Sequence, residues 1–224
     1  MTIDSYYMDI SPPVRAVNLC LAALNLEVNR KEINLFNREN LEPAFIQLNP
    51  QHTIPTIVDD GFVLWDSHAI NAYLVSKYAK DDSLYPKDIQ KRAIIDQRLH
   101  FEGSVLFTHG VRCFLPLFFG LSKTIPEDQR SQTDQYYEMV DKFLEGNTWI
   151  AGDQLTIADF SYISTLSGLS VLIYLQQIFT GVEKYRNIST YMDRCKEIMK
   201  DYDTANQQGV DKYVGILKNI LQSE

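Results

Sequence analysis

The sequence predicts an α+β protein of two domains: a small α/β domain with the element order βαβ-α-ββα, followed by an all-α helical domain. Its length of 224 residues fits two compact domains, since single domains commonly hold about 100–200 residues. Short apolar runs alternate with helical patterns over roughly the first 80 residues, whereas every later periodic segment is helical. Hydrophobic residues make up 45% of the chain and charged residues 22%, so a sizeable core can be buried.

The first domain, residues 1–80, is expected to alternate strands with helices. Apolar residues from Val14 to Leu24 follow helical spacing, and Asp60 and Gly61 form a hairpin-turn signal between two apolar runs. Ser67 begins the last helix of the domain. The expected strands are residues 3–8, 28–33, 55–58 and 62–65, and the expected helices are residues 13–24, 41–47 and those from 67 onward.

Residues 81–87 are polar and include Pro86, which is typical of a linker. Residues 88–224 then form the helical domain. One of its helices begins at Thr156 in an expected capping box, in which the Thr156 hydroxyl caps the helix and Asp159 accepts a hydrogen bond from the Thr156 amide. The inward residues expected in the first long helix are Ala93, Ile94, Leu99, Val105 and Leu106. The expected helices are residues 88–119, kinked near Pro116, and residues 126–146, 185–200 and 210–221.

Charge and cysteine content exclude several classes of protein. Lysine and arginine number 21 against 29 aspartates and glutamates, a net charge of −8, and nucleic-acid binding needs clustered positive charge. The three cysteines, Cys20, Cys113 and Cys195, are widely spaced, so we expect neither a disulfide framework nor a metal site. The amino terminus lacks the basic flank and apolar run of a signal peptide, and we expect a cytoplasmic protein.

Residues 160–182 contain no charged side chain and are long enough to span a bilayer. Their composition argues against a lipid-facing helix, because too many of them are polar or small. Ser161, Ser164, Thr165 and Gly168 follow helical spacing, so that a neighbouring helix could approach closely. We therefore expect a buried central helix here and no contact with a membrane.

The first candidate for chemistry is Ser11, which lies where the first strand turns into the first helix. Serine before Pro12 and Pro13 has an ordinary explanation, since serine at the cap and proline at the first positions begin many helices. The second candidate is Pro55 at the start of a strand. In the βαβ-α-ββα order of the thioredoxin-like fold this proline is characteristically cis, and Ile54 before it presents free backbone groups to a peptide.

The third candidate is the pair Asp66 and Ser67 at the start of a helix. Either the two residues only cap the helix, or they bind a zwitterion. In the second case the Asp66 carboxylate binds the ammonium group of the zwitterion, and the turn at Ser67 binds its carboxylate.

In this order and spacing, the motifs resemble the glutathione site of the cytosolic glutathione S-transferases. The chain is most similar to the insect delta/epsilon group and, within it, to the epsilon class. The resemblance rests on residues 10–17 (ISPPVRAV), 48–56 (LNPQHTIPT), 66–70 (DSHAI), 101–107 (FEGSVLF) and 155–160 (LTIADF). Two positions depart from the family pattern: Asp66 stands where many relatives have glutamate, and Asn40 where delta-class relatives often have histidine.

The resemblance implies that Ser11 is the catalytic hydroxyl and holds the sulfur of the co-substrate glutathione as a thiolate. A free thiol has a pKa of about 8.5, and lowering it by roughly two units requires about 2.7 kcal/mol. A hydroxyl donor and the positive end of a helix can supply energy of this size. The other glutathione-binding residues that the resemblance implies are His52, Thr53, Ile54, Pro55, Asp66, Ser67 and His68.

The second substrate, a small hydrophobic electrophile, is expected in a cleft between the domains. Arg112 is informative, because an arginine among apolar neighbours is rarely placed for packing alone. Phe119, nearby, is expected to be helix core instead. The candidate wall consists of Leu35, Phe107, Val111, Arg112, Phe114 and Leu115.

We therefore expect an enzyme that conjugates glutathione to hydrophobic electrophiles. The class resemblance implies detoxification of xenobiotics and insecticides, with peroxidase and dehydrochlorinase activities as further options. The alternative is a glutathione-binding carrier of hydrophobic ligands with little turnover. The resemblance also implies a homodimer, formed through the helices that begin at Ser67 and Asp88.

Overall fold

The computed structural model describes residues 2–174 and 184–222, and its first part is a four-stranded sheet flanked by helices. The strand order is β2-β1-β3-β4, with β1 parallel to β2 and antiparallel to β3. The strands are β1 (Ile3–Tyr7), β2 (Val28–Glu32), β3 (Thr56–Asp59) and β4 (Phe62–Trp65), and the helices are α1 (Pro12–Leu24), the 3₁₀ turn η1 (Glu39–Leu41), α2 (Pro43–Leu48) and α3 (Ser67–Tyr78). This is the predicted βαβ-α-ββα order of the thioredoxin-like fold.

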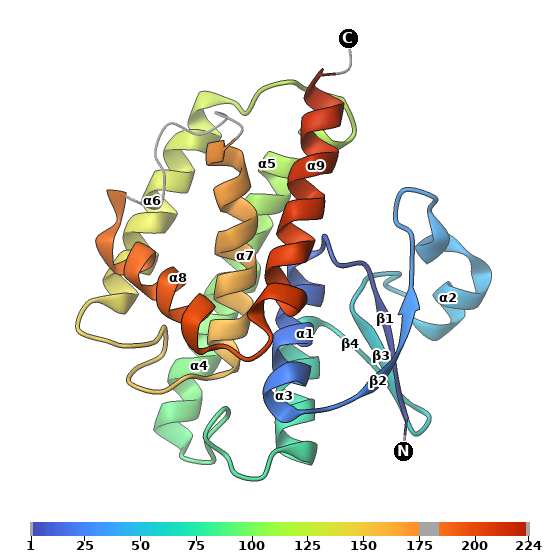
Figure 1. The fold of residues 1–224 in the computed structure, drawn as a ribbon, viewed down its shortest axis with the longest axis vertical. Helices are drawn as coiled ribbons and strands as arrows, with labels where there is room; N and C mark the ends of the chain where they lie inside the picture. Colours follow the sequence, from blue (N-terminus) through green and yellow to red (C-terminus); the bar gives the residue numbers. More distant parts are fainter. Residues whose placement is uncertain (1, 175–183, 223–224) are drawn as a thin grey trace.

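Helices α1 and α3 lie between the sheet and the helical domain, and α2 lies on the other side of the sheet (Figure 1). The helical domain contains α4 (Ile89–Phe101), the π-helical segment η2 (Glu102–Phe107), α5 (Thr108–Phe118), α6 (Glu127–Leu144), α7 (Ile157–Tyr174), α8 (Arg186–Ile198), the π-helical segment η4 (Asp203–Gln207) and α9 (Gln208–Gln222). The elements that line the cavity between the domains include α1 and α3 on one side and α4, η2 and α5 on the other.

Helix α7 is the predicted buried central helix, and every side chain from Ile157 to Leu169 is buried. A methyl group added at Gly168 would lie 3.2 Å from Nη2 of Arg15 and 3.5 Å from Cγ of Pro12, so α1 approaches α7 closely at this glycine. The predicted continuation of this helix through residues 175–182 lies outside the described residues. Within the described part of the chain, no helix is both long and apolar enough to cross a membrane.

Half of the predicted capping box at the start of α7 is present: Asp159 accepts from the Thr156 amide, but the Thr156 hydroxyl donates to Asp159 and does not cap the helix. The amide of Thr156 donates to Oδ2 of Asp159 at 2.8 Å, and the Thr156 hydroxyl donates to the same oxygen at 3.1 Å. The amide of Ile150 donates to the other carboxylate oxygen at 2.9 Å. Asp159 thus joins the helix start to the preceding loop, although burial raises the pKa of this carboxyl to about 6.

The prediction of the inner face of residues 88–119 was partly wrong. Leu99 and Leu106 are buried, but Ala93 is exposed and Ile94 is 44% exposed, while Ile95 is buried. Ile95 and Leu99 are four residues apart and share one face of α4, Leu106 lies in η2, and both elements pack against α7. Phe119 was wrongly expected in the core: it is 64% exposed, since α5 ends at Phe118 and the chain turns there.

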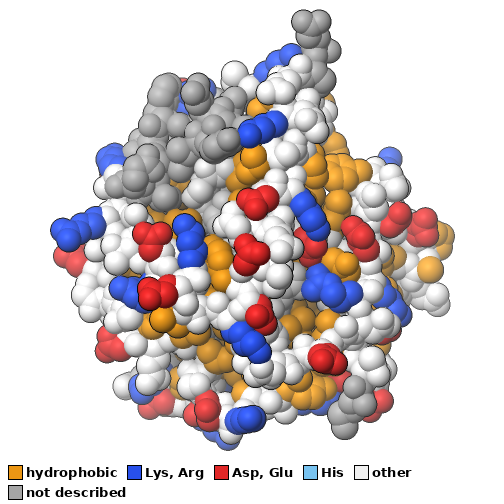
Figure 2. Space-filling view, viewed as in Figure 1, with side chains coloured by type: hydrophobic (Ala, Val, Ile, Leu, Met, Phe, Trp, Pro, Cys, Tyr) orange, Lys and Arg blue, Asp and Glu red, His pale blue; other side chains and the backbone are white. Residues whose placement is uncertain are grey.

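Charged side chains of both signs are interspersed over the face shown in Figure 2. Neither the acidic nor the basic groups gather into one large patch on this face. This face therefore offers no continuous basic band of the kind that binds a nucleic acid backbone.

Candidate active site

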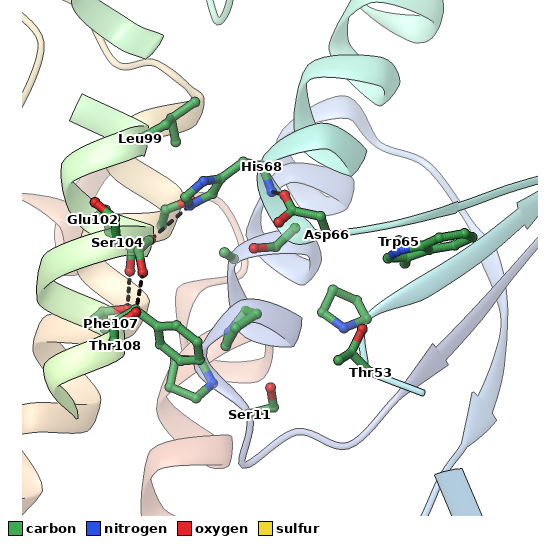
Figure 3. Close-up of a pocket in the computed structure, with 18 of the residues that line it drawn as sticks. Ser11, Thr53, Trp65, Asp66, His68, Leu99, Glu102, Ser104, Phe107 and Thr108 are labelled. Atoms are coloured by element: carbon green, nitrogen blue, oxygen red, sulfur yellow. Dashed lines mark hydrogen bonds and ion pairs between the residues drawn. The ribbon is translucent and has the colours of Figure 1, made fainter. Parts of the chain in front are cut away.

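A cavity of about 480 Å³ lies between the two domains (Figure 3). Its size falls within the range of about 300–1,000 Å³ that is typical of sites for small molecules. Ser11, Thr53 and Asp66 lie on one side, and Ser104, Phe107 and Thr108 face them from η2 and α5. The sequence-predicted residues that line the cavity are Ser11, Thr53, Ile54, Pro55, Asp66, Ser67, His68 and Phe107.

Ser11 lies at the N-cap of α1, yet its hydroxyl does not cap the helix. Its backbone carbonyl accepts the amide of Arg15 at 3.1 Å, the bond that begins the helix. The next two residues, Pro12 and Pro13, have no N–H to offer a capping side chain. The Ser11 hydroxyl is therefore available to a ligand at the positive end of the α1 dipole.

The segment before β3 is held by the buried side chain of Asn49. Its amide nitrogen donates to the carbonyl of Thr53 at 3.0 Å and to the hydroxyl of Thr56 at 3.0 Å. The peptide bond between Ile54 and Pro55 is cis, as predicted. Among the described residues, neither the N–H nor the C=O of Ile54 has a hydrogen-bond partner, so both can pair with an extended peptide.

Asp66 has one of the two roles that the sequence left as alternatives, and its geometry leaves room for the other. It is the N-cap of α3, and its Oδ1 accepts the amides of His68 at 2.9 Å and Ala69 at 3.1 Å. Its backbone has a φ of 74°, a left-handed conformation that costs a non-glycine residue about 1–3 kcal/mol and is common at functional sites. The cap uses one carboxylate oxygen, and the amide and hydroxyl of Ser67 remain available, so capping does not exclude ligand binding.

His68 links this helix to the helical domain. Its Nε2 lies 2.8 Å from Oε2 of Glu102, and the Thr165 hydroxyl donates to Oε1 of Glu102 at 2.5 Å. Burial disfavours the charged imidazole, but the hydrogen bond and the charge of Glu102 outweigh it, and the pKa of His68 is raised. The result is a buried polar network beneath the cavity.

The sequence analysis missed Glu102, although one signal could have revealed it. Glu102 lies three residues after Leu99 and four residues before Leu106, so helical spacing places it on the buried face. Its neighbour Gly103 allows the close approach of His68, because a methyl group there would lie 3.1 Å from the imidazole Cε1. Other lining residues that were missed are Gln51, Trp65, Leu99, His100, Ser104, Thr108 and Ser161.

Several predicted residues lie outside the lining of this cavity. His52 is exposed, and its carbonyl accepts the side-chain amide of Asn40 at 3.0 Å. Leu35 packs instead in a small cluster with Met8 and Phe45. The remaining ones all belong to α5: Val111 and Phe114 are half-buried, and Arg112 and Leu115 are exposed.

An aromatic contact next to these residues joins the two domains. The ring of Phe36, in the loop after β2, stacks on the ring of Phe118 with their centroids 4.9 Å apart. Phe118 also contacts Tyr213 of α9, whose ring meets Phe114 edge-on at 5.0 Å. Neither Phe36 nor Phe118 was singled out from the sequence, though Phe36 directly follows the predicted Leu35.

The three cysteines are free and buried. Burial raises the pKa of the Cys113 thiol to about 11, so this thiol is un-ionised at neutral pH. Over residues 2–174 and 184–222, no three histidine, cysteine or acidic side chains gather as metal ligands would.

The fold and the site together define a class: a two-domain protein with a thioredoxin-like domain, a helical domain and a cavity between them. Models of the family match both domains, "Glutathione S-transferase, N-terminal domain" over residues 10–77 and "Glutathione S-transferase, C-terminal domain" over residues 107–198. The chain belongs to the glutathione S-transferase family, whose enzymes use glutathione as a co-substrate.

Individual insect proteins are similar over nearly the whole chain. Glutathione S-transferase 1 of Manduca sexta is 37% identical over 212 residues, which cover 94% of this chain and 95% of that protein. The epsilon-class enzyme of the housefly, Musca domestica, is 43% identical, with a TM-score of 0.91 over 98% of both chains. A homologue from Drosophila mojavensis, solved with bound glutathione, is 40% identical, with a TM-score of 0.90 over 97% of both chains.

Proposed function

We propose that this chain binds glutathione in the interdomain cavity and that Ser11 stabilises the thiolate for attack on a hydrophobic electrophile. The observation that supports this most directly is the Ser11 hydroxyl, which caps no helix and lines the cavity at the start of α1. A hydroxyl in this position can donate a charge-assisted hydrogen bond to sulfur.

Glutathione would lie across the first domain with its three parts on different groups. The cysteinyl backbone pairs with the free N–H and C=O of Ile54. The γ-glutamyl carboxylate accepts hydrogen bonds from the amide and hydroxyl of Ser67, and the γ-glutamyl ammonium pairs with the carboxylate of Asp66. The glycyl end extends toward Thr53 and His52, whose exposed side chain can move to meet it.

The reaction depends mainly on ionising the sulfur of glutathione, and it requires no reactive side chain of the protein. The S–H proton leaves to solvent, and the Ser11 O–H donates to the resulting thiolate. The thiolate then attacks an electrophilic carbon, and either a leaving group departs or the adduct gains a proton. Lowering the thiol pKa by about two units corresponds to about 2.7 kcal/mol, and proximity of the two substrates supplies a further part of the rate.

The electrophile would bind against the helical domain. Phe107 lines the cavity, and the wall would extend along α5 through Val111, Phe114 and Leu115. Arg112 is exposed on the same helix, where its charge can attract polarised electrophiles. Leu35, from the loop after β2, would close the wall opposite. This site would suit xenobiotics, including insecticides that are conjugated or dehydrochlorinated, and glutathione-dependent reduction of peroxides is a further option.

The proposed roles divide the chain at the linker of residues 81–87. Residues 1–80 would bind glutathione, residues 88–224 would bind the electrophile, and both parts would contribute a helix to the contact with a second copy of the chain. Ile89 is 82% exposed and Ile94 is 44% exposed on α4. A homodimer that buries α3 and α4 would remove this apolar surface from water. Such an enzyme would act in the cytoplasm.

Conjugation of a model aryl halide to glutathione by the Ser11→Ala variant tests the proposal. A hydrogen bond to a charged group is worth about 1.5–3 kcal/mol, so we expect kcat/KM to fall roughly 10- to 100-fold. Ser189→Ala on α8, far from the cavity, is the matched control and should leave the rate unchanged. Unchanged conjugation by Ser11→Ala would contradict the mechanism. If the unmodified protein turns over no substrate yet binds apolar ligands tightly, the carrier function is favoured.

A further inference from the structure

The turn that places Ser11 lies in contact with the C-terminal helix. The amide of Ser11 donates to the carbonyl of Met8 at 3.0 Å, which closes a four-residue turn with Asp9 and Ile10 at its centre. Helix α9 belongs to the helical domain, and Figure 1 shows its first residues beside α1. The position of Ser11 therefore depends on what holds Asp9.

Gly209, in the first turn of α9, makes the closest approach to this segment. An ideal Cβ at Gly209 would lie 2.3 Å from the backbone oxygen of Asp9 and 2.8 Å from Cδ of Arg15. Asp9 is two residues before Ser11, and Arg15 is four residues after it. Only glycine permits α9 to pack this closely on both sides of the serine.

The Arg15 side chain cannot easily move away from an atom added at Gly209. Arg15 is fully buried between α1 and α7, where its Nη2 donates to the carbonyl of Ser164 at 2.9 Å and its Nη1 to the hydroxyl of Ser167 at 3.3 Å. A side chain added at Gly209 would therefore displace the Asp9 peptide or α9 itself, rather than the guanidinium.

Lys212 adds an electrostatic contact one turn along the same helix. Its Nζ lies 3.1 Å from Oδ2 of Asp9, while Nη2 of Arg30 on β2 lies 2.8 Å from Oδ1. The Lys212 side chain is 60% exposed, and a pair this exposed contributes little to global stability. Its effect is to orient Asp9, which is held from the sheet and from α9 at once.

We propose that Gly209 and Lys212 of α9 are positioning residues for the Ser11 hydroxyl, so that the helical domain controls the ionisation of glutathione bound to the first domain. The proposal rests on the proposed function of Ser11. It assigns to the start of α9 a role in the thiolate step, which the residues of the cavity do not reveal.

The test compares Gly209→Ala with Gly215→Ala. Gly215 lies on the same helix, and a Cβ there would meet no atom within 4 Å, so the two variants add the same methyl group with and without a contact. Thiolate of bound glutathione is titrated by ultraviolet difference absorbance, and kcat and KM for glutathione are measured across pH. A helix that only supports the fold would leave this titration unchanged.

For Gly209→Ala we expect the thiolate titration to shift upward by roughly half to one pH unit, a three- to tenfold loss of thiolate below the midpoint. Gly215→Ala should titrate as the unmodified protein does. If the titration of Gly209→Ala is unshifted, the added methyl group displaces α9 and not the turn that holds Ser11. That result would overturn the proposal.

Surface variants keep the test decisive if Gly209→Ala fails to fold. Lys212→Gln alters an exposed group, and Asp9→Asn alters a half-buried one. Each should shift the thiolate titration upward, with about a twofold loss of thiolate below the midpoint. Unshifted titrations in both would refute the proposal. Ser11→Ala distinguishes failure of the proposed function from failure of this inference. If Ser11→Ala does not shift the titration, the proposed function itself fails. If Ser11→Ala shifts the titration and the α9 variants do not, only this inference fails.

Discussion

The carboxylate of Glu102 lies 2.8 Å from the imidazole Nε2 of His68 and joins the two domains across the candidate active site. Glu102 lies on η2 and is 4% exposed, and the Thr165 hydroxyl donates a hydrogen bond to its other carboxylate oxygen. His68 directly follows Ser67, which lines the cavity from the first domain. The two sides of the cavity are therefore joined through one buried acid.

The stability given by this pair should depend on pH. The folded pKa of His68 is raised above its usual value of about 6.5, so the contribution of the pair is complete below that value and is lost as pH rises through the folded pKa. We expect Glu102→Gln to lower the free energy of unfolding by about 1–3 kcal/mol near pH 6 and by less near pH 9. Denaturant unfolding at a series of pH values measures this difference.

A suitable control for this prediction is an exposed pair. Lys196 lies 3.5 Å from Asp193 on α8, and both side chains are at least half exposed. Asp193→Asn should change stability by less than about 1 kcal/mol at every pH between 6 and 9. A Glu102→Gln penalty that stays constant over the same range would show that the neutral imidazole bonds as well as the charged one.

Two substitutions of Asp66 should separate its capping role from its ligand role. Asparagine caps helices as well as aspartate does, so Asp66→Asn should keep the free energy of unfolding. It removes the charge that would face the γ-glutamyl ammonium, and we expect KM for glutathione to rise roughly two- to fivefold. Asp66→Ala should show the same rise and also lose about 1 kcal/mol of stability. An unchanged KM in both variants would limit Asp66 to the cap.

Local patterns were sufficient to predict much of this fold. The spacing of Val14, Val17 and Leu21 marks α1, and the Asp60 and Gly61 turn marks the hairpin of β3 and β4, because both signals lie within a few residues of chain. These are features that a single element determines by itself. Ser11 and Asp66 also stand at helix starts, but their assignment to a site depended on the order and spacing of several motifs and on the family resemblance.

Contacts between distant segments could not be predicted in the same way. Glu102 pairs with a histidine 34 residues away, and an acid within an amphipathic helix is ordinarily expected to face water. The π-helical segment η2 also changes the helical spacing, so that Val105, expected inward, is only half-buried. The role of Gly209 depends on two further elements, and no local pattern distinguishes it from Gly215.

Asp159 should be essential for stability without affecting glutathione binding. Its two oxygens accept the amides of Ile150 and Thr156 in a fully buried site. In Asp159→Asn, the amide NH₂ replaces one acceptor with a donor that faces another N–H. We expect a loss of about 2–4 kcal/mol in the free energy of unfolding. Asp153→Asn, in the exposed part of the same loop, is the control, and KM for glutathione in folded Asp159→Asn should match that of the unmodified enzyme.

The stack of Phe36 on Phe118 should influence the electrophile and not glutathione. The two rings join the loop after β2 to α5, the helix of the proposed electrophile wall, and their centroids are 4.9 Å apart. An aromatic pair is worth about 0.5–1.5 kcal/mol, so Phe36→Ala should raise KM for a bulky apolar electrophile roughly two- to tenfold. KM for glutathione should stay constant, because the Ser11 and Ile54 groups do not touch this ring. Ile46→Ala on α2 removes a side chain that is 39% exposed, against 42% for Phe36, and controls for the loss of exposed apolar surface. If both variants change KM for the electrophile equally, the stack does not shape the site.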